Sequence, residues 1–280
     1  MSIKINRNIV LTNPETKSFL ADAYYKKSED KLPLVILVHG YKGFKDWGAW
    51  HYLAEAFAEA GFYFVKFNFS HNGTTLDDTS NFADLEAFGH NNYSKEMSDL
   101  TFVIDYFSKL PEVDASKIAL IGHSRGNGNV VIQASEDHRI KALVDFAGIS
   151  DYAWRFPPKE MLPEIKKAGV LYIENKRTKQ QMPHYFQFFE DFKANEERFT
   201  IENAVKKLSL PYLIIHGSAD ETVNLGEAEL LHQWAKNSEL LVIENGDHGF
   251  GSFEPWSEKQ MPKDLKFVTE KTIEFLKDKL

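Results

Sequence analysis

Residues 118–126 read IALIGHSRG, a short aliphatic run that ends in the pattern Gly-x-Ser-x-Gly. A helical pattern follows over residues 126–135. A strand, a tight turn and a helix in this order are the setting in which such a turn lifts a serine hydroxyl clear of the sheet edge. Glycine is needed on both sides of the serine because a Cβ there would collide with neighbouring backbone. Ser124 is therefore the candidate nucleophile.

Alternating strand and helix patterns extend outward from this turn. Short continuous apolar runs, which indicate strands buried on both faces, occupy residues 34–38, 62–67, 118–121, 143–146, 212–215 and 240–243. Helical spacing of apolar residues occurs over residues 50–60, 93–110, 126–135, 226–236 and 263–279. Residues 3–11 and 17–25 alternate around a Thr-Asn-Pro turn, which predicts an antiparallel pair. The pattern predicts an α/β fold with a mostly parallel, doubly wound sheet.

Residues 150–207 interrupt this rhythm. They contain Pro157, Pro158, Pro163 and Pro183 and many aromatic residues. They also separate two core strands by far more than the usual loop of about 2–6 residues. We predict a core domain of residues 1–149 and 208–280, with residues 150–207 as an inserted cap. Such a cap would lie over the carboxyl ends of the strands, where sheets of this kind bind ligands.

A serine hydroxyl is a weak nucleophile at neutral pH, so it needs a base, which a carboxylate in turn orients. Residues 212–220 (YLIIHGSAD) are an apolar strand and a turn that ends in Asp220. Residues 241–250 (LVIENGDHGF) are a second strand and a turn that contains His248. Glu221 and Asp247 are alternative acids, but Asp220 directly follows its strand. We predict that Asp220 orients His248 and that His248 is the base for Ser124.

A further glycine turn ends the strand at residues 34–38, in the sequence HGYKG of residues 39–43. A backbone N–H in such a turn can point at a developing oxyanion. We assign the oxyanion hole to the backbone N–H groups of Tyr41 and Arg125, roles that need no particular side chain. His39 and His216 each precede a glycine at a strand end, and we expect both to be structural.

These turns together resemble the α/β-hydrolase superfamily over nearly the whole chain. The matching motifs are HG at residues 39–40, GHSRG at 122–126, HGSAD at 216–220 and GDHGF at 246–250. The resemblance implies an α/β-hydrolase fold and a Ser124–His248–Asp220 triad that works through an acyl-enzyme. The cap, with the segment ENKRTKQQMPHYFQFFEDF at 174–192, is similar to that of bacterial cinnamoyl and feruloyl esterases and dienelactone-hydrolase-like proteins. Asn127 departs from the superfamily pattern, in which a second glycine is usual at this position.

Aromatic residues are concentrated in the predicted cap. Tyr152 and Trp154 come shortly after the core strand at residues 143–146, so we predict that they contact substrate. Phe186 and Phe189 are spaced as on one helix face, and we expect them to pack onto the domain. Aromatic walls suit an aryl or arylacyl ester.

The composition excludes several classes of function. The chain has 33 Lys and Arg against 41 Asp and Glu, and this acidic balance argues against nucleic acid or anionic lipid as the main partner. The absence of cysteine excludes disulfides, thiolate metal sites and cysteine nucleophiles. No histidine pair has metal-ligand spacing, so we predict neither a metal nor a cofactor. There is no apolar run of about 20 residues and no signal-peptide pattern, and we therefore expect a cytoplasmic protein without a membrane partner.

We predict a serine carboxylic ester hydrolase that acts through an acyl-enzyme on small esters, aryl or hydroxycinnamoyl esters among them. Three alternatives stay open: a prolyl-oligopeptidase-like serine peptidase, a thioesterase or acyltransferase that uses the same acyl-enzyme, and a non-catalytic binding protein that kept the fold. The sequence also leaves open a homodimer and the identity of the acyl and alcohol groups.

Overall fold

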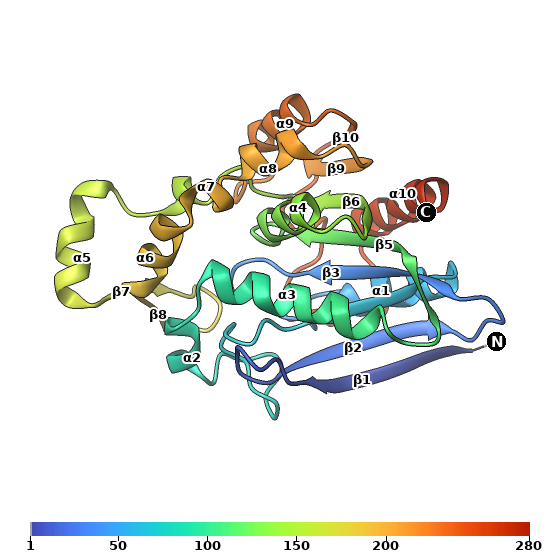
Figure 1. Ribbon diagram of the computed structural model, residues 1–280, viewed down its shortest axis with the longest axis horizontal. Coiled ribbons are helices and arrows are strands. Elements are labelled where there is room, and N and C mark those ends of the chain that lie inside the picture. The colour runs from blue at the N-terminus through green and yellow to red at the C-terminus, as the bar shows by residue number, and fades with distance from the viewer. Residues whose placement is uncertain (1) are drawn as a thin grey trace.

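An eight-stranded sheet organises the chain in the computed structural model, which describes residues 2–280 (Figure 1). Its strands lie in the order β1-β2-β4-β3-β5-β6-β9-β10. All pairs from β4 to β10 are parallel, whereas β1 and β2 add an antiparallel edge. The strands are β1 (Ile3–Leu11), β2 (Phe19–Lys26), β3 (Leu32–Val38), β4 (Tyr63–Phe67), β5 (Val113–His123), β6 (Ile140–Phe146), β9 (Tyr212–Gly217) and β10 (Ser238–Ile243). The predicted mostly parallel α/β sheet is confirmed.

Helices cover both faces of the sheet because successive residues of each central strand point to opposite sides. In β3, Leu34, Ile36 and Val38 belong to one buried cluster, and Val35 and Leu37 belong to the other. The first cluster is covered by α3 (Tyr93–Phe107), α4 (Gly126–Glu136), α8 (Ile201–Lys207) and α9 (Leu225–Trp234), and the second by α1 (Trp50–Glu59) and α10 (Lys263–Lys279). None of the helices described over residues 2–280 has the length and apolar character needed to cross a membrane.

Most of the segment 150–207 forms a lobe beyond the end of the sheet toward which β3 points (Figure 1). The lobe consists of η1 (Ala153–Arg155), η2 (Lys159–Met161), α5 (Leu162–Ala168), the antiparallel pair β7 (Val170–Glu174) and β8 (Gln181–Tyr185), α6 (Gln187–Ala194) and α7 (Glu196–Phe199). A short helix outside the segment, α2 (Leu85–Gly89), packs against β8.

The last helix of the predicted cap segment, α8, packs with helices of the core. It contacts α4 and α9. Ile201, Ala204 and Val205 are buried in the same cluster as the apolar residues of α4. The reason is the apolar spacing of these three residues, which gives α8 one face to bury against the sheet layer. Helix α8 thus joins the predicted cap segment to the core, since it also contacts α7.

The turn between β5 and α4 has the strained geometry that its glycines permit. Ser124 has a φ of +55°, in the left-handed region. A Cβ added to Gly122 would lie 2.6 Å from the Cα of Asn127, and one added to Gly126 would lie 2.5 Å from the carbonyl oxygen of Val38. Neither position has room for a side chain. Because both residues are glycine, the turn can pass close to β3 and present Ser124 at the sheet edge.

Asn127 occupies the position where a second glycine is usual, and its side chain forms hydrogen bonds that a glycine could not form. Its side chain is fully buried at the start of α4. Its Nδ2 donates to the carbonyl oxygen of Ile149 at 3.2 Å, and its Oδ1 accepts from the Tyr212 hydroxyl at 2.9 Å. The amide thus joins the turn to the segment after β6 and to β9, and its buried polar atoms are satisfied.

Candidate active site

Asp220 and His248 come together at the carboxyl ends of β9 and β10. Nδ1 of His248 lies 2.8 Å from Oδ2 of Asp220. The other carboxylate oxygen, Oδ1, accepts the backbone N–H groups of Thr222 at 2.8 Å and Val223 at 2.9 Å. The Asp220 side chain is fully buried, whereas 22% of the His248 side chain is exposed. The backbone thus fixes the carboxylate, and the carboxylate fixes the ring.

The two alternative acids have other surroundings. Oδ1 of Asp247 accepts the backbone N–H groups of Gly249 at 3.0 Å and Gly251 at 2.8 Å, so this carboxylate shapes its own turn. Glu221 is exposed. Among the three carboxylates considered from the sequence, Asp220 is the one that contacts the ring of His248.

His216 contacts the same carboxylate from the buried side. Its Nε2 lies 2.9 Å from the carbonyl oxygen of Val223 and 3.3 Å from Oδ2 of Asp220. Burial would raise the pKa of the Asp220 carboxyl, but hydrogen bonds from His216 and His248 hold that pKa well below its usual value. Asp220 is therefore ionised at neutral pH. The sequence predicts a structural role for His216 but contains no signal for this contact with Asp220.

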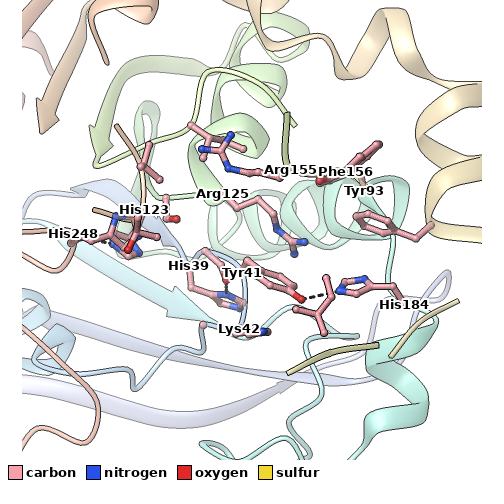
Figure 2. Close-up of a pocket in the computed structure, with 18 of the residues that line it drawn as sticks. His39, Tyr41, Lys42, Tyr93, His123, Arg125, Arg155, Phe156, His184 and His248 are labelled. Atoms are coloured by element: carbon pink, nitrogen blue, oxygen red, sulfur yellow. Dashed lines mark hydrogen bonds between the residues drawn. The ribbon is translucent and has the colours of Figure 1, made fainter. Parts of the chain in front are cut away.

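Ser124 and His248 line one cavity of about 420 Å³ between the core and the cap (Figure 2). The glycine turn after β3 runs beside the serine, because a Cβ on Gly40 would lie 2.8 Å from the Cβ of Ser124 and 3.3 Å from its Oγ. Tyr41 and Arg125, the residues assigned to the oxyanion hole, also line the cavity. Within residues 2–280, no direct hydrogen bond joins Oγ of Ser124 to His248, whose Nδ1 is bonded to Asp220.

The rest of the cavity wall is aromatic and cationic. Its apolar part includes Trp47, Trp50, Tyr93, Phe156, Phe188 and Phe189. Lys42, Arg125 and Arg155 also line the cavity, whereas no lining residue within the described chain is acidic. Arg125 pairs with the buried Glu96 and Arg155 with Glu227, so two of the three cations already have a carboxylate partner outside the cavity wall.

The two residues predicted to contact substrate, Tyr152 and Trp154, do not line this cavity. Tyr152 is 1% exposed, and its hydroxyl donates to Oδ1 of Asn129 at 3.0 Å. Its ring packs against that of Tyr93, with centroids 4.0 Å apart, so Tyr93 stands between it and the cavity. Trp154 is 61% exposed on the surface. We therefore correct this prediction: position just after a core strand does not place these side chains at the cavity.

The cap residues that do reach the cavity come from further along the segment. Phe156, His184, Phe188 and Phe189 line it. The concentration of aromatic residues in the cap was the available signal, but it could not separate the residues that face the cavity from those that pack elsewhere. The sequence gives no sign that Tyr93, at the start of α3, lines the cavity, because only folding brings this residue to the cavity wall.

Two other histidines border the cavity, and each has at least one ring nitrogen in contact with a backbone group. Nδ1 of His39 lies 2.9 Å from the carbonyl oxygen of Gly40, and its Nε2 accepts the N–H of Phe69 at 3.3 Å. Nε2 of His123 lies 3.1 Å from the carbonyl oxygen of His248. These contacts suit structural roles. Across residues 2–280, no group of three or more His, Asp or Glu side chains is placed to hold a metal ion.

Four buried histidines make the stability of the protein sensitive to acid. Burial, the largest cause in each case, lowers the pKa of His39 and His71 to about 4 and that of His123 and His184 to about 3. In the unfolded chain each pKa returns to about 6.5. Between these values the unfolded state binds more protons, so stability falls as the pH falls from about 6.5 toward about 4.

We expect the free energy of unfolding, measured with urea, to decrease between pH 7 and pH 5. Three groups work in the opposite direction. Burial raises the pKa of the Asp99 carboxyl to about 6 and that of Asp145 well above its usual value. Against the effect of burial, the hydrogen bond to Asp220 raises the pKa of His216. Acid therefore favours the folded state through these three groups. These three groups offset only part of the effect of the four histidines. As a control, His184→Phe should flatten the pH dependence. A free energy of unfolding that stays level or rises on acidification would contradict this prediction.

The fold and this site define a member of the α/β-hydrolase superfamily. The chain belongs to the prolyl oligopeptidase family, whose model matches residues 52–273. It is 29% identical over 121 residues to an Escherichia coli protein, the uncharacterized 31.7 kDa protein in the traX-finO intergenic region, and 28% identical over 133 residues to platelet-activating factor acetylhydrolase of Cavia porcellus. These alignments cover 43% and 48% of this chain but only 39% and 27% of the two relatives.

Among solved structures, Est1E from Butyrivibrio proteoclasticus with ferulic acid bound is 22% identical, with a TM-score of 0.70. The match covers 97% of this chain and 98% of Est1E. DcsB in complex with its substrate analogue is 17% identical, with a TM-score of 0.72 and 99% of both chains covered. At these identities the likeness shows the fold, and it extends through the cap.

Proposed function

We propose that the protein is a serine carboxylic ester hydrolase that acts through an acyl-enzyme on small esters with an aryl or hydroxycinnamoyl acyl group. The observation that carries the proposal is the cavity in which Ser124 lies together with His248, while His248 is bonded to the buried Asp220. Two similar proteins support ester chemistry: one is an acetylhydrolase, and the other is described with ferulic acid bound.

The hydrogen bond between His248 and Asp220 decides which ring nitrogen can act as base. Because Asp220 is ionised, it accepts the Nδ1 proton and leaves Nε2 with a free lone pair. Nε2 then takes the Ser124 proton as Oγ attacks the ester carbonyl carbon. The imidazolium returns this proton to the alcohol as the ester C–O bond breaks. Water hydrolyses the acyl-enzyme through the same base.

The negative charge on the attacked carbonyl oxygen needs hydrogen-bond donors beside the serine. The backbone N–H groups of Tyr41 and Arg125 are the proposed donors. The close approach of Gly40 to Ser124 supports this role, because it brings the turn that contains Tyr41 to the nucleophile. In serine hydrolases, removal of one such donor lowers kcat by about 10²–10³-fold.

The wall of the cavity favours a planar, neutral or anionic acyl group. Phe156, Phe188 and Phe189 offer ring faces and edges on which an aromatic acyl group can pack. No lining residue in the described part of the chain is a carboxylate. A cationic group on a substrate would therefore lose its hydration without gaining an ionic partner.

The family match favours a second candidate, a serine peptidase that cleaves after proline. It would use the same acyl-enzyme chemistry. The charges of the wall argue against peptides with a free amino terminus near the cleaved bond, since such an amine would face Lys42, Arg125 and Arg155 rather than a carboxylate.

A matched substrate panel tests the proposal. We expect methyl ferulate and p-nitrophenyl acetate to be hydrolysed and a chromogenic prolyl peptide to remain intact, with kcat/KM measured for each under the same conditions. p-Nitrophenyl octanoate reports whether the cavity accepts a long flexible chain. Cleavage of the peptide without turnover of any ester would contradict the esterase proposal and favour the serine peptidase.

A further inference from the structure

The two residues assigned to the oxyanion hole touch each other through their side chains. The guanidinium of Arg125 lies over the ring of Tyr41, with its carbon 5.0 Å from the ring centroid, and 5.6 Å from the ring centroid of Tyr93 (Figure 2). The proposed catalytic roles of Tyr41 and Arg125 use only backbone N–H groups. The side chains are therefore free to fix the positions of those groups relative to each other.

Arg125 is held from the side of α3. Its guanidinium pairs with Glu96, whose side chain is 1% exposed. Oε1 of Glu96 also accepts Nδ2 of Asn91 at 2.6 Å, and Oε2 accepts Nδ2 of Asn129 at 3.2 Å. Three donors thus satisfy this buried carboxylate, so the ion pair has one well-defined geometry.

Tyr41 is held from the side of the cap. Its hydroxyl forms a hydrogen bond of 2.7 Å with Nε2 of His184 on β8, and the two rings are stacked with centroids 5.6 Å apart. Burial raises the pKa of Tyr41 to about 12 and lowers that of His184 to about 3, so both groups are neutral near neutral pH. The imidazole also packs against Phe88 and Phe188.

We propose that Glu96 and His184 are positioning residues that hold the two oxyanion N–H groups through the side chains of Arg125 and Tyr41. The four residues form one continuous set of contacts, from α3 through the nucleophile turn and the turn after β3 to the cap strand β8. We call this set the oxyanion brace. The cap then contributes to the reaction by fixing Tyr41 as well as by enclosing substrate. This inference rests on the proposed ester hydrolysis.

The test removes one hydroxyl from the brace. Tyr41→Phe keeps the backbone N–H and the ring but loses the bond to His184. Because a displacement of about 1 Å can cost about 10²-fold in rate, we expect kcat for p-nitrophenyl acetate to fall about 10–100-fold with KM within about twofold. The pH profile of kcat should not move, because the brace does not contact the ring of His248.

An inhibitor that occupies the oxyanion hole distinguishes a displaced oxyanion N–H group from a general loss of stability in the variant. Phenylboronic acid forms a bond between its boron and Oγ of Ser124, the serine proton moves to His248, and one boron oxygen takes the place of the oxyanion. We expect its inhibition constant to rise by the same factor as kcat falls. Tyr185→Phe is the matched control, since this hydroxyl bonds Glu86 at 2.5 Å and joins β8 to α2 without touching the brace. It should leave both values unchanged.

A double variant closes the test. Tyr41→Phe/His184→Phe should lose no more rate than either single variant, because each removes the same bond. The inference would be overturned by an unchanged kcat in Tyr41→Phe, or by a loss of kcat in Tyr185→Phe as large as that in Tyr41→Phe. The proposed function would still stand if the wild type hydrolysed esters and this hydrolysis depended on Ser124. If Tyr41→Phe fails to fold, His184→Phe carries the comparison. If the wild type hydrolyses no ester, the proposed function is wrong. The oxyanion brace is then tested by the binding of phenylboronic acid alone, and a wild type that does not bind phenylboronic acid would overturn the brace as well.

Discussion

Replacing Ser124 with alanine is expected to lower kcat for p-nitrophenyl acetate by about 10⁵–10⁶-fold. In the proposed mechanism the hydroxyl supplies the atom that bonds to the substrate carbonyl. Within the described chain, Thr222 is the only other residue with an aliphatic hydroxyl that lines the cavity. The remaining rate would come from water activated by His248 and from the oxyanion donors. KM should change little, because the hydroxyl contributes little to substrate binding.

The control for this variant is Ser218→Ala. Ser218 lies at the same edge of the sheet, just after β9, and its Oγ accepts the backbone N–H of Asn245 at 2.8 Å. It does not line the cavity. Its loss should leave kcat within about twofold. Esterase activity that survives in Ser124→Ala, with matching circular dichroism spectra for both variants, would refute Ser124 as the nucleophile.

Asp220→Asn is expected to lower kcat by about 10⁴-fold, the size of effect known for this substitution in a serine protease triad. The contacts of the carboxylate explain why. Oδ1 accepts two backbone N–H groups, from Thr222 and Val223, so the amide oxygen of an asparagine would occupy that place. The amide NH₂ would then face Nδ1 of His248 and force the proton onto Nε2. In that tautomer His248 cannot accept the proton of Ser124.

Asp247→Asn is the matched control for this prediction. Its Oδ1 accepts the N–H groups of Gly249 and Gly251, and an amide oxygen can accept both just as well. We expect kcat to stay within a few-fold of the wild type. If Asp247→Asn or Glu221→Gln removed the activity and Asp220→Asn left it unaffected, the acid would have been assigned to the wrong residue.

The fold could be predicted from the sequence because its signals are local. The aliphatic run at residues 118–121 and the two glycines that follow it are sufficient for the turn at Ser124, since Gly122 and Gly126 have no room for a side chain. The other strands and the helices of the core were found by the same periodic patterns. Apolar spacing alone does not say which layer a helix covers, and α8, within the predicted cap segment, contacts α4 and α9 of the core as well as α7.

Part of the candidate site could likewise be predicted from the sequence and part could not. Asp220 and His248 end neighbouring strands, so parallel pairing of β9 and β10 brings them together once the sheet is known. The cavity wall could not be predicted, because it depends on how the cap folds back over the core. Tyr152 follows β6 closely in sequence yet is buried behind Tyr93, whereas His184, far along the cap, bonds Tyr41.

The most direct test of the acyl-enzyme proposal is the site of covalent labelling by a fluorophosphonate. Trypsin cleaves after Lys117 and Arg125, so Ser124 is the only serine in the peptide IALIGHSR, residues 118–125. We predict rapid labelling of this peptide by mass spectrometry, in proportion to the loss of esterase activity, and no labelling in Ser124→Ala. Full loss of activity with the label on another peptide, or ester hydrolysis by a protein that never labels, would contradict the account.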